Sequence, residues 1–194
     1  MLSKKPRPSS KHSPIAFFSM FLLSAIAYVT SLFYPGLMDQ LAVKYEDGIG
    51  VLSILHMITH MFAHSGFIHL TGNFVFGGPL CIYLERKIGS LKFLAIWFIT
   101  GVCGSLFFMI TPSLFGWTEL LGSSVAISGC VFYALLSCKE NKIVRVLSIL
   151  FMAFLFMSQY IATCTAIVMP TGTAFAAHLG GMVTAMLLYC LVEK

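Results

Sequence analysis

The feature that most constrains this chain is a run of 47 residues, from Val146 to Val192, without an aspartate, glutamate, lysine or arginine. A helix crosses a membrane with about 20 mostly apolar residues, so the run is too long for one such helix. Its middle contains the sequence MPTG at residues 169–172, and proline and glycine together interrupt a helix. We therefore expect two membrane helices in this run.

The composition of the whole chain indicates the same environment. The 194 residues are 58% hydrophobic and only 10% charged, where a soluble domain carries about a quarter charged residues. So little polar surface cannot cover a water-soluble globule, which predicts an all-α integral membrane protein. We expect a basic cytoplasmic tail at 1–13 and one membrane domain at 14–194, with six spans at 14–37, 67–84, 93–110, 120–138, 146–168 and 173–192.

The distribution of lysine and arginine predicts the orientation of these spans. If there are six, the N-terminal tail and all the later basic residues fall on one side, and only Lys44 falls on the other. Basic connections stay in the cytoplasm, so both termini are predicted to be cytoplasmic. The basic tail has no aromatic side chains for stacking on bases, which argues against nucleic-acid binding.

Residues 48–66 are uncharged but less uniform than the spans. Ser53, His56, His60 and His64 follow one another at spacings of three, four and four, which places them on one face of a helix. We expect an interfacial helix here, with His56 and His60 on an edge that faces water.

Few polar side chains lie inside the predicted spans, and such residues usually face a cavity or a partner. They include His69 and Asn73, four residues apart on one helix face, and His178 in the last span. No acidic or basic residue lies within a span, which argues against an ion-coupled transporter. Gly77 continues the line of His69 and Asn73 and leaves room beside it.

The same absences exclude two kinds of intramembrane protease. A zinc enzyme needs a His-Glu-x-x-His helix, and no glutamate accompanies a histidine pair in this chain. An aspartyl enzyme needs two intramembrane aspartates, whereas Asp39 and Asp47 both lie in the first outer loop. Serine and histidine remain as candidates for chemistry.

The run LLGSSVAISG at residues 120–129 contains the candidate serines Ser123, Ser124 and Ser128. A serine becomes a nucleophile beside a base, with donors that stabilise the oxyanion. His178 and the His69/Asn73 pair would supply these parts if the second, fourth and sixth spans converge. A serine in a membrane helix more commonly bonds to a carbonyl one turn earlier. We expect this for Ser123 and Ser128 when each is considered by itself.

The last span also carries a sign of close packing. Gly181 and Ala185 are four residues apart, a spacing of small residues that lets two membrane helices approach closely. Close approach to the fourth span is what a pair of serine and histidine requires. The alternative interpretation of His178 is an interhelical hydrogen-bond partner in a noncatalytic bundle.

Taken together, three motifs resemble those of the rhomboid serine proteases. The run from His60 through His64 and His69 to Asn73, followed by Gly-Pro and by ERKIG at 85–89, is similar to the second span of that family. LGSSVAISG resembles the family's Gly-x-Ser-Gly motif, and AHLGG at 177–181 resembles the histidine motif of its last span. The resemblance covers roughly residues 50–192, and the motifs occur in the family's order.

The resemblance implies a minimal six-helix rhomboid-like bundle in which Ser124 is the nucleophile and His178 the base. Asn73, His69 and the Ser124 backbone N–H would form the oxyanion hole beside Gly122. It further implies cleavage of single-span membrane proteins near the outer membrane face, without a cofactor or metal.

Supporting roles are expected for two further residues. Ser128, one turn after Ser124 on the same face, is predicted to orient the His178 imidazole, and His64 to bond within the outer loop. Ser124 is predicted to lie one turn inside the fourth span. The compact size favours a bacterial inner membrane.

Two features depart from the family's pattern. Val125 stands where the family motif has glycine, and the short first outer loop lacks the family's Trp-Arg pair. If the backbone at Val125 is ordinary right-handed helix, valine costs only side-chain freedom, and we expect this helical case.

Two other functions remain open from the sequence. One is a rhomboid-like binding module with weak or no catalytic activity. The other is a membrane metal or haem protein that uses His60, His64, His69 or His178 as ligands. The sequence does not reveal the natural substrate or the oligomeric state.

Overall fold

The computed structural model describes residues 12–111, 119–166 and 175–192. The described part is mostly helical, as predicted. The helices are α1 (Ile15–Ser31), α2 (Leu37–Leu41), α3 (Val51–Thr59), α4 (Phe67–Ile88), α5 (Ser90–Ile110), α6 (Ser124–Ser137), α7 (Lys142–Ala166) and α8 (Phe175–Val192), with the short 3-10 helices η1 (Tyr45–Asp47) and η2 (His60–Phe62). Two short strands, β1 (Val43–Lys44) and β2 (Glu119–Leu120), complete the elements.

Six of these helices, α1 and α4 to α8, overlap the six predicted spans in order. Among the described residues α4, α5 and α8 are long and apolar enough to cross a membrane, and α1 and α6 are shorter apolar helices. The number of crossings and the sidedness of the termini therefore stay predictions. The predicted helix break at residues 169–172 and nearly all of the basic tail lie outside the described residues.

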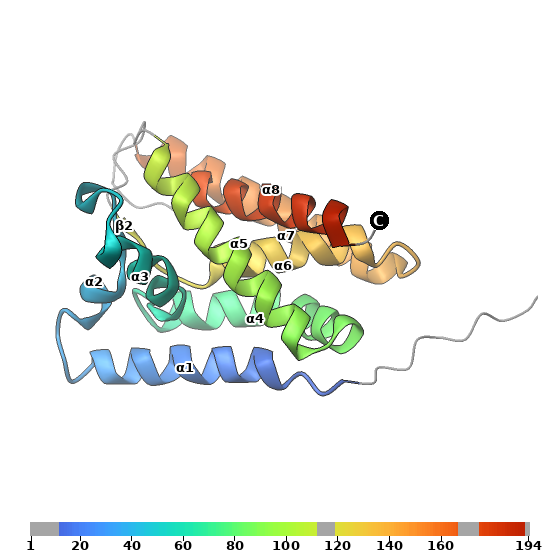
Figure 1. Ribbon diagram of the computed structural model, residues 1–194, viewed down its shortest axis with the longest axis horizontal. Coiled ribbons are helices and arrows are strands. Elements are labelled where there is room, and N and C mark those ends of the chain that lie inside the picture. Colours follow the sequence, from blue (N-terminus) through green and yellow to red (C-terminus); the bar gives the residue numbers. More distant parts are fainter. Residues whose placement is uncertain (1–11, 112–118, 167–174, 193–194) are drawn as a thin grey trace, which may run out of the picture.

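The helix that carries the candidate nucleophile is central to the bundle. α6 packs against α4, α5, α7 and α8, and its residues from Val125 to Val131 are all buried. Figure 1 shows α1 and α4 along one edge of the bundle, with α5 crossing obliquely toward α8. The start of α1 and the end of α8 lie toward one end of the bundle, and α2, α3 and β2 lie at the other.

Small residues let α6 approach its neighbours closely. A Cβ atom on Gly77 of α4 would lie 2.2 Å from Cγ2 of Ile127, so any larger residue there would push α4 away from α6. This is the room that the sequence predicted beside the His69 and Asn73 line. Tight packing of this kind is how helices associate in a membrane, where the hydrophobic effect does not drive them together.

A buried carboxylate joins the beginning of α1 to the end of α4. Glu85 has no exposed surface, and its two oxygens accept hydrogen bonds from the backbone N–H groups of Ala16 and Phe17, both at 2.8 Å. Ser90 at the start of α5 donates a third bond at 2.6 Å. The first N–H groups of a helix lack partners within the helix and favour negative charge, so this carboxylate is well satisfied although buried.

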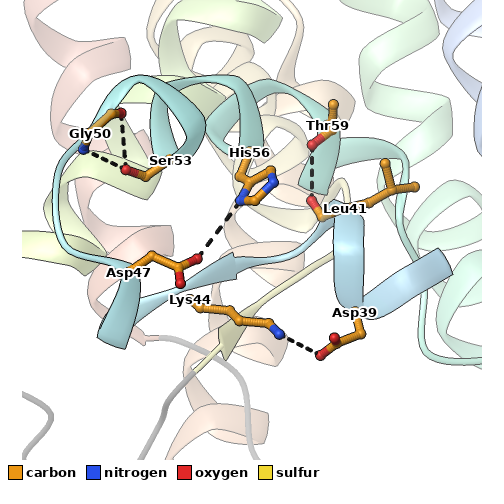
Figure 2. A network of polar contacts seen from close by, with 8 residues as sticks. All are labelled: Asp39, Leu41, Lys44, Asp47, Gly50, Ser53, His56 and Thr59. Carbon is orange, nitrogen blue, oxygen red and sulfur yellow. Dashed lines mark hydrogen bonds and ion pairs between the residues drawn. The ribbon is translucent and has the colours of Figure 1, made fainter. Parts of the chain in front are cut away.

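The segment between α1 and α4, named the first outer segment after its predicted side of the membrane, is folded and stabilised by its own polar contacts (Figure 2). Lys44 pairs with Asp39 at 2.8 Å, and the Thr59 hydroxyl donates to the carbonyl of Leu41 at 3.0 Å. His56 faces Asp47 at 3.9 Å. Asp39 is mostly exposed, so its ion pair contributes little to stability, and the hydrogen bonds within the segment fix its path.

The prediction that the polar side of the helix at 48–66 faces water was wrong. His60 has no exposed surface and Ser53 is 3% exposed, whereas Leu52 and Leu55 on the opposite side are more than half exposed. The polar stripe therefore faces the protein, and the apolar side faces outward. In a lipid environment this inverted arrangement is expected, because the polar groups find their partners inside the protein.

The expectation of an all-α protein also missed a small sheet. β1 and β2 pair antiparallel, with Val43 opposite Leu120 and Lys44 opposite Glu119. This pairing ties the first outer segment to the residues just before the candidate nucleophile. The predicted fourth span began at residue 120, but α6 begins at Ser124, which is thus its first residue instead of lying one turn inside.

Candidate active site

The turn into α6 places Ser124 at the beginning of the central helix. Gly122 has φ of +111°, a conformation that disfavours any residue with a Cβ atom. Its N–H donates to the carbonyl of His60 at 2.9 Å, which holds the turn against η2. Ser124 is partly buried and lies at the helix N-terminus, where backbone N–H groups have no partner within the helix.

The structure brings Ser124 and His178 together. Nε2 of His178 lies 2.9 Å from Oγ of Ser124, although the two residues are 54 positions apart in the chain. His178 is on the first turn of α8 and only 2% exposed, so the imidazole is held in place by its surroundings. With Nε2 unprotonated, the hydroxyl donates to it, which is the arrangement that a serine nucleophile and its base require.

His69 and Asn73 lie next to Gly122. A Cβ on Gly122 would lie 2.8 Å from Nε2 of His69 and 3.4 Å from Nδ2 of Asn73, so both nitrogens face the turn that leads to Ser124. Nδ2 of Asn73 is buried and has no hydrogen-bond partner among the described residues. A buried amide donor without a partner is costly, and a developing oxyanion would satisfy it.

The second ring nitrogen of His69 also has a hydroxyl neighbour. Nδ1 lies 3.0 Å from the Ser65 hydroxyl. If that hydroxyl donates, Nδ1 is the acceptor and Nε2 carries the proton. His69 then presents an N–H donor toward the same side as Asn73.

His64 bonds to the residue before the candidate nucleophile, a contact that the sequence did not reveal. Nδ1–H of His64 donates to the Phe62 carbonyl at 3.3 Å, so Nε2 is an acceptor. Nε2 accepts from the Ser123 hydroxyl at 3.2 Å and faces the Ser123 backbone N–H at 3.4 Å. The Phe62 bond lies within the segment between α1 and α4, and the bonds to Ser123 fix the start of α6.

His60 forms a further buried pair with Ser105 of α5. Nε2 of His60 lies 2.7 Å from the Ser105 hydroxyl, which also donates to the Gly101 carbonyl at 2.8 Å. Because the Ser105 hydroxyl donates its proton to the Gly101 carbonyl, it accepts a hydrogen bond from Nε2–H of His60. The Nδ1 atom of His60 has no partner among the described residues. Ser105 is one of two hydroxyl residues in an otherwise apolar span, together with Thr100, and this was the only signal that could have identified it from the sequence.

Burial determines the charge of both loop histidines. Desolvation lowers the pKa of His60 to about 3, with smaller contributions from His64 and His178, and lowers the pKa of His64 to about 4. Both are therefore neutral at pH 7. A neutral imidazole of such low basicity is a poor general base, so the bond from Ser123 to His64 has a structural character.

Ser128 lies within the site region but bonds inside its own helix. Its hydroxyl is fully buried and donates to the Val125 carbonyl at 2.7 Å, the common behaviour of a serine in a membrane helix. The predicted orienting role toward His178 stays a prediction. Val125 itself has ordinary helical backbone, since every residue with positive φ among the described ones is a glycine.

Each of the histidines considered as metal ligands has a serine hydroxyl as a neighbour. The four pairs are His60 with Ser105, His64 with Ser123, His69 with Ser65, and His178 with Ser124. Within residues 12–111, 119–166 and 175–192, no three side chains of the histidine, cysteine, aspartate and glutamate types are grouped to hold a metal ion. The arrangement of these groups suits proton transfer and hydrogen bonding.

Comparison with known proteins adds a family to this geometry. Residues 52–194 match the family model of the Rhomboid domain. The chain is also similar to "Rhomboid-like protease 3" of Toxoplasma gondii, with 24% identity over 159 residues, which is 79% of this chain and 57% of that protein. The chain thus spans little more than half of the length of this relative. The region that matches the family model, residues 52–194, contains every residue of the site described above.

Proposed function

This chain belongs to the rhomboid family, and we propose that it is an intramembrane serine endopeptidase in which Ser124 and His178 form the catalytic dyad. The observation that carries the proposal is the 2.9 Å separation between Ser124 Oγ and His178 Nε2. The Ser124 hydroxyl lies at the beginning of a helix, next to the buried imidazole of His178 and after a turn that faces the buried Asn73 amide nitrogen. These groups correspond to the nucleophile, the base and an oxyanion donor of acyl transfer.

The proposed reaction begins with attack of Ser124 Oγ on the scissile carbonyl, while His178 Nε2 accepts the hydroxyl proton. The oxyanion of the tetrahedral intermediate is stabilised by the Asn73 amide, His69 Nε2–H and the Ser124 backbone N–H. Collapse of this intermediate breaks the C–N bond, and His178 gives the proton to the leaving amine. A water molecule, with His178 again as base, then hydrolyses the acyl-enzyme and restores both side chains.

The proposed substrates are single-span membrane proteins. They would be cut near the outer membrane face, because the site lies at the end of the bundle that carries the first outer segment (Figure 1). The distribution of lysine and arginine supports an outer location for this end of the bundle. The relative from Toxoplasma gondii is named a protease, which supports the reaction class.

Covalent labelling with a fluorophosphonate probe tests the proposal. The purified protein in detergent micelles should be labelled, and Ser124→Ala and His178→Ala should lose labelling almost completely. Ser123→Ala is the matched control, because Ser123 is the neighbouring serine and also contacts a histidine. Equal labelling of the wild type and Ser124→Ala would overturn the proposal. Labelling that is lost in Ser123→Ala but kept in Ser124→Ala would identify Ser123 as the nucleophile instead.

A further inference from the structure

The residue after the candidate nucleophile fills a notch formed by two other helices. Val125 has no exposed surface. A Cβ on Gly104 of α5 would lie 2.3 Å from Cγ1 of Val125, and one on Gly181 of α8 would lie 3.4 Å from the same atom. The distance at Gly104 is far too short for a real contact, whereas the distance at Gly181 is an ordinary van der Waals contact. The branched side chain therefore occupies space that exists because the facing residue on α5 is glycine, and it packs beside Gly181 of α8.

The walls of this notch flank the candidate base. A Cβ on Gly104 would also lie 2.6 Å from the carbonyl oxygen of Ala177, the residue before His178. A Cβ on Gly181, three residues after His178, would lie 2.9 Å from the carbonyl oxygen of Val125. The backbone of α6 just after Ser124 thus lies close to the backbone of α8 on one side of His178, and α5 lies close to the backbone of α8 on the other side.

We propose that Val125 is a positioning residue, whose side chain in the notch of Gly104 and Gly181 sets the separation of α6 and α8 and so the Ser124–His178 distance. The inference rests on the proposed function. Val125 touches neither the substrate carbonyl nor the transferred proton in this scheme. It acts by fixing the two helices whose first turns carry the nucleophile and the base.

The inference reverses the simple expectation for this position. If valine were only tolerated, restoring the glycine of the Gly-x-Ser-Gly motif would leave the enzyme as fast or make it faster. In this chain, Val125→Gly leaves a void between three helices, because no other side chain reaches the notch from Gly104 or Gly181. Packed interiors respond to such a void by shifting, and a shift between α6 and α8 acts directly on the dyad.

The test compares Val125→Gly, Val125→Ala and Val125→Thr with wild type and with Val131→Ala. Val131 is the matched control, because it is also fully buried in α6 and loses the same atoms, but its packing cluster does not include Val125. Threonine keeps the branched shape of valine, and within a helix its hydroxyl can bond to an earlier carbonyl. The measurements are the maximal rate and the half-saturating concentration for labelling by the fluorophosphonate probe, together with the unfolding temperature.

We expect Val125→Gly and Val125→Ala to lower the maximal labelling rate by about tenfold to a hundredfold, with little change in the half-saturating concentration. The maximal labelling rate of Val125→Thr should stay within about threefold of wild type. The rate of Val131→Ala should stay within about twofold, even if its unfolding temperature falls as much as that of the Val125 variants. If Val125→Gly fails to fold, Val125→Ala decides.

Two results would overturn the inference while leaving the proposed function intact. One is Ser124-dependent labelling of Val125→Gly or Val125→Ala at or above the wild-type rate. The other is an equal loss in Val131→Ala, which would reduce Val125 to general packing. Labelling of wild type that does not depend on Ser124 would instead overturn the proposed function, and this inference with it.

Discussion

Acidification is expected to destabilise the folded protein through His60 and His64, the two buried histidines beside the turn into α6. Burial lowers the pKa of His64 from 6.5 to about 4 and that of His60 to about 3. The folded protein therefore binds these protons less readily than the unfolded chain does. Their stabilising contribution is fully present above pH 6.5 and is lost as the pH falls from there toward the folded-state pKa.

The size of the effect follows from the two pKa values of each group. At about pH 4.5 the unfolded chain binds a proton at His64 almost fully, while the folded protein binds one only in part, which corresponds to about 2.5 kcal/mol of lost stability. His60 contributes a similar amount. The two losses are not independent, because a charge on His64 lowers the pKa of His60.

Thermal unfolding in mild detergent micelles, followed by circular dichroism, measures this loss. Wild type, His64→Gln and His12→Gln are compared at about pH 7.5 and about pH 4.5, so that carboxylates that titrate in the same range contribute equally to all three. His12 is exposed and serves as the matched control. We expect the loss on acidification to be smaller by about 2.5 kcal/mol in His64→Gln and unchanged in His12→Gln.

An equal loss of stability on acidification in His64→Gln and wild type would refute a stabilising contribution from the buried neutral His64. That outcome would mean that His64 accepts a proton in the folded protein without cost. A lower absolute stability of His64→Gln at neutral pH is expected in any case, because the bonds to Ser123 are altered. Only the difference between the two pH values tests the burial of the charge.

Three substitutions in the site have defined expectations for fluorophosphonate labelling. Asn73→Ala should lower the rate about a hundredfold with an unchanged unfolding temperature, because it removes one oxyanion donor, and a wild-type rate would exclude that role. Gly122→Ala should reduce labelling at least as much, because its φ of +111° disfavours alanine and the new Cβ would lie 2.8 Å from His69 Nε2. Ser128→Ala should slow labelling about tenfold if Ser128 orients His178. An unchanged rate would leave Ser128 only its bond to the Val125 carbonyl.

The sequence by itself determined the helical membrane character and the family, and it supplied the candidate residues. Charge-free runs of membrane-spanning length favour helices, because a helix pairs its own backbone N–H and C=O groups without water. The order of the three motifs was enough to identify the rhomboid family, which the match over residues 52–194 confirmed. The helical conformation at Val125 was also predicted, since a bulky residue at positive φ would be strained.

Only the tertiary structure decided which elements far apart in the chain contact one another. The polar stripe of α3 and η2 has the same period whether it faces water or protein, and only the packing of η2 against Ser105 buries His60. The pairing of β1 with β2 joins two-residue strands that carry no pattern of their own. Likewise, valine at position 125 looked like a defect in a motif until the facing Gly104 and Gly181 were located. Long-range partners of this kind are fixed by three-dimensional packing, which local spacing does not encode.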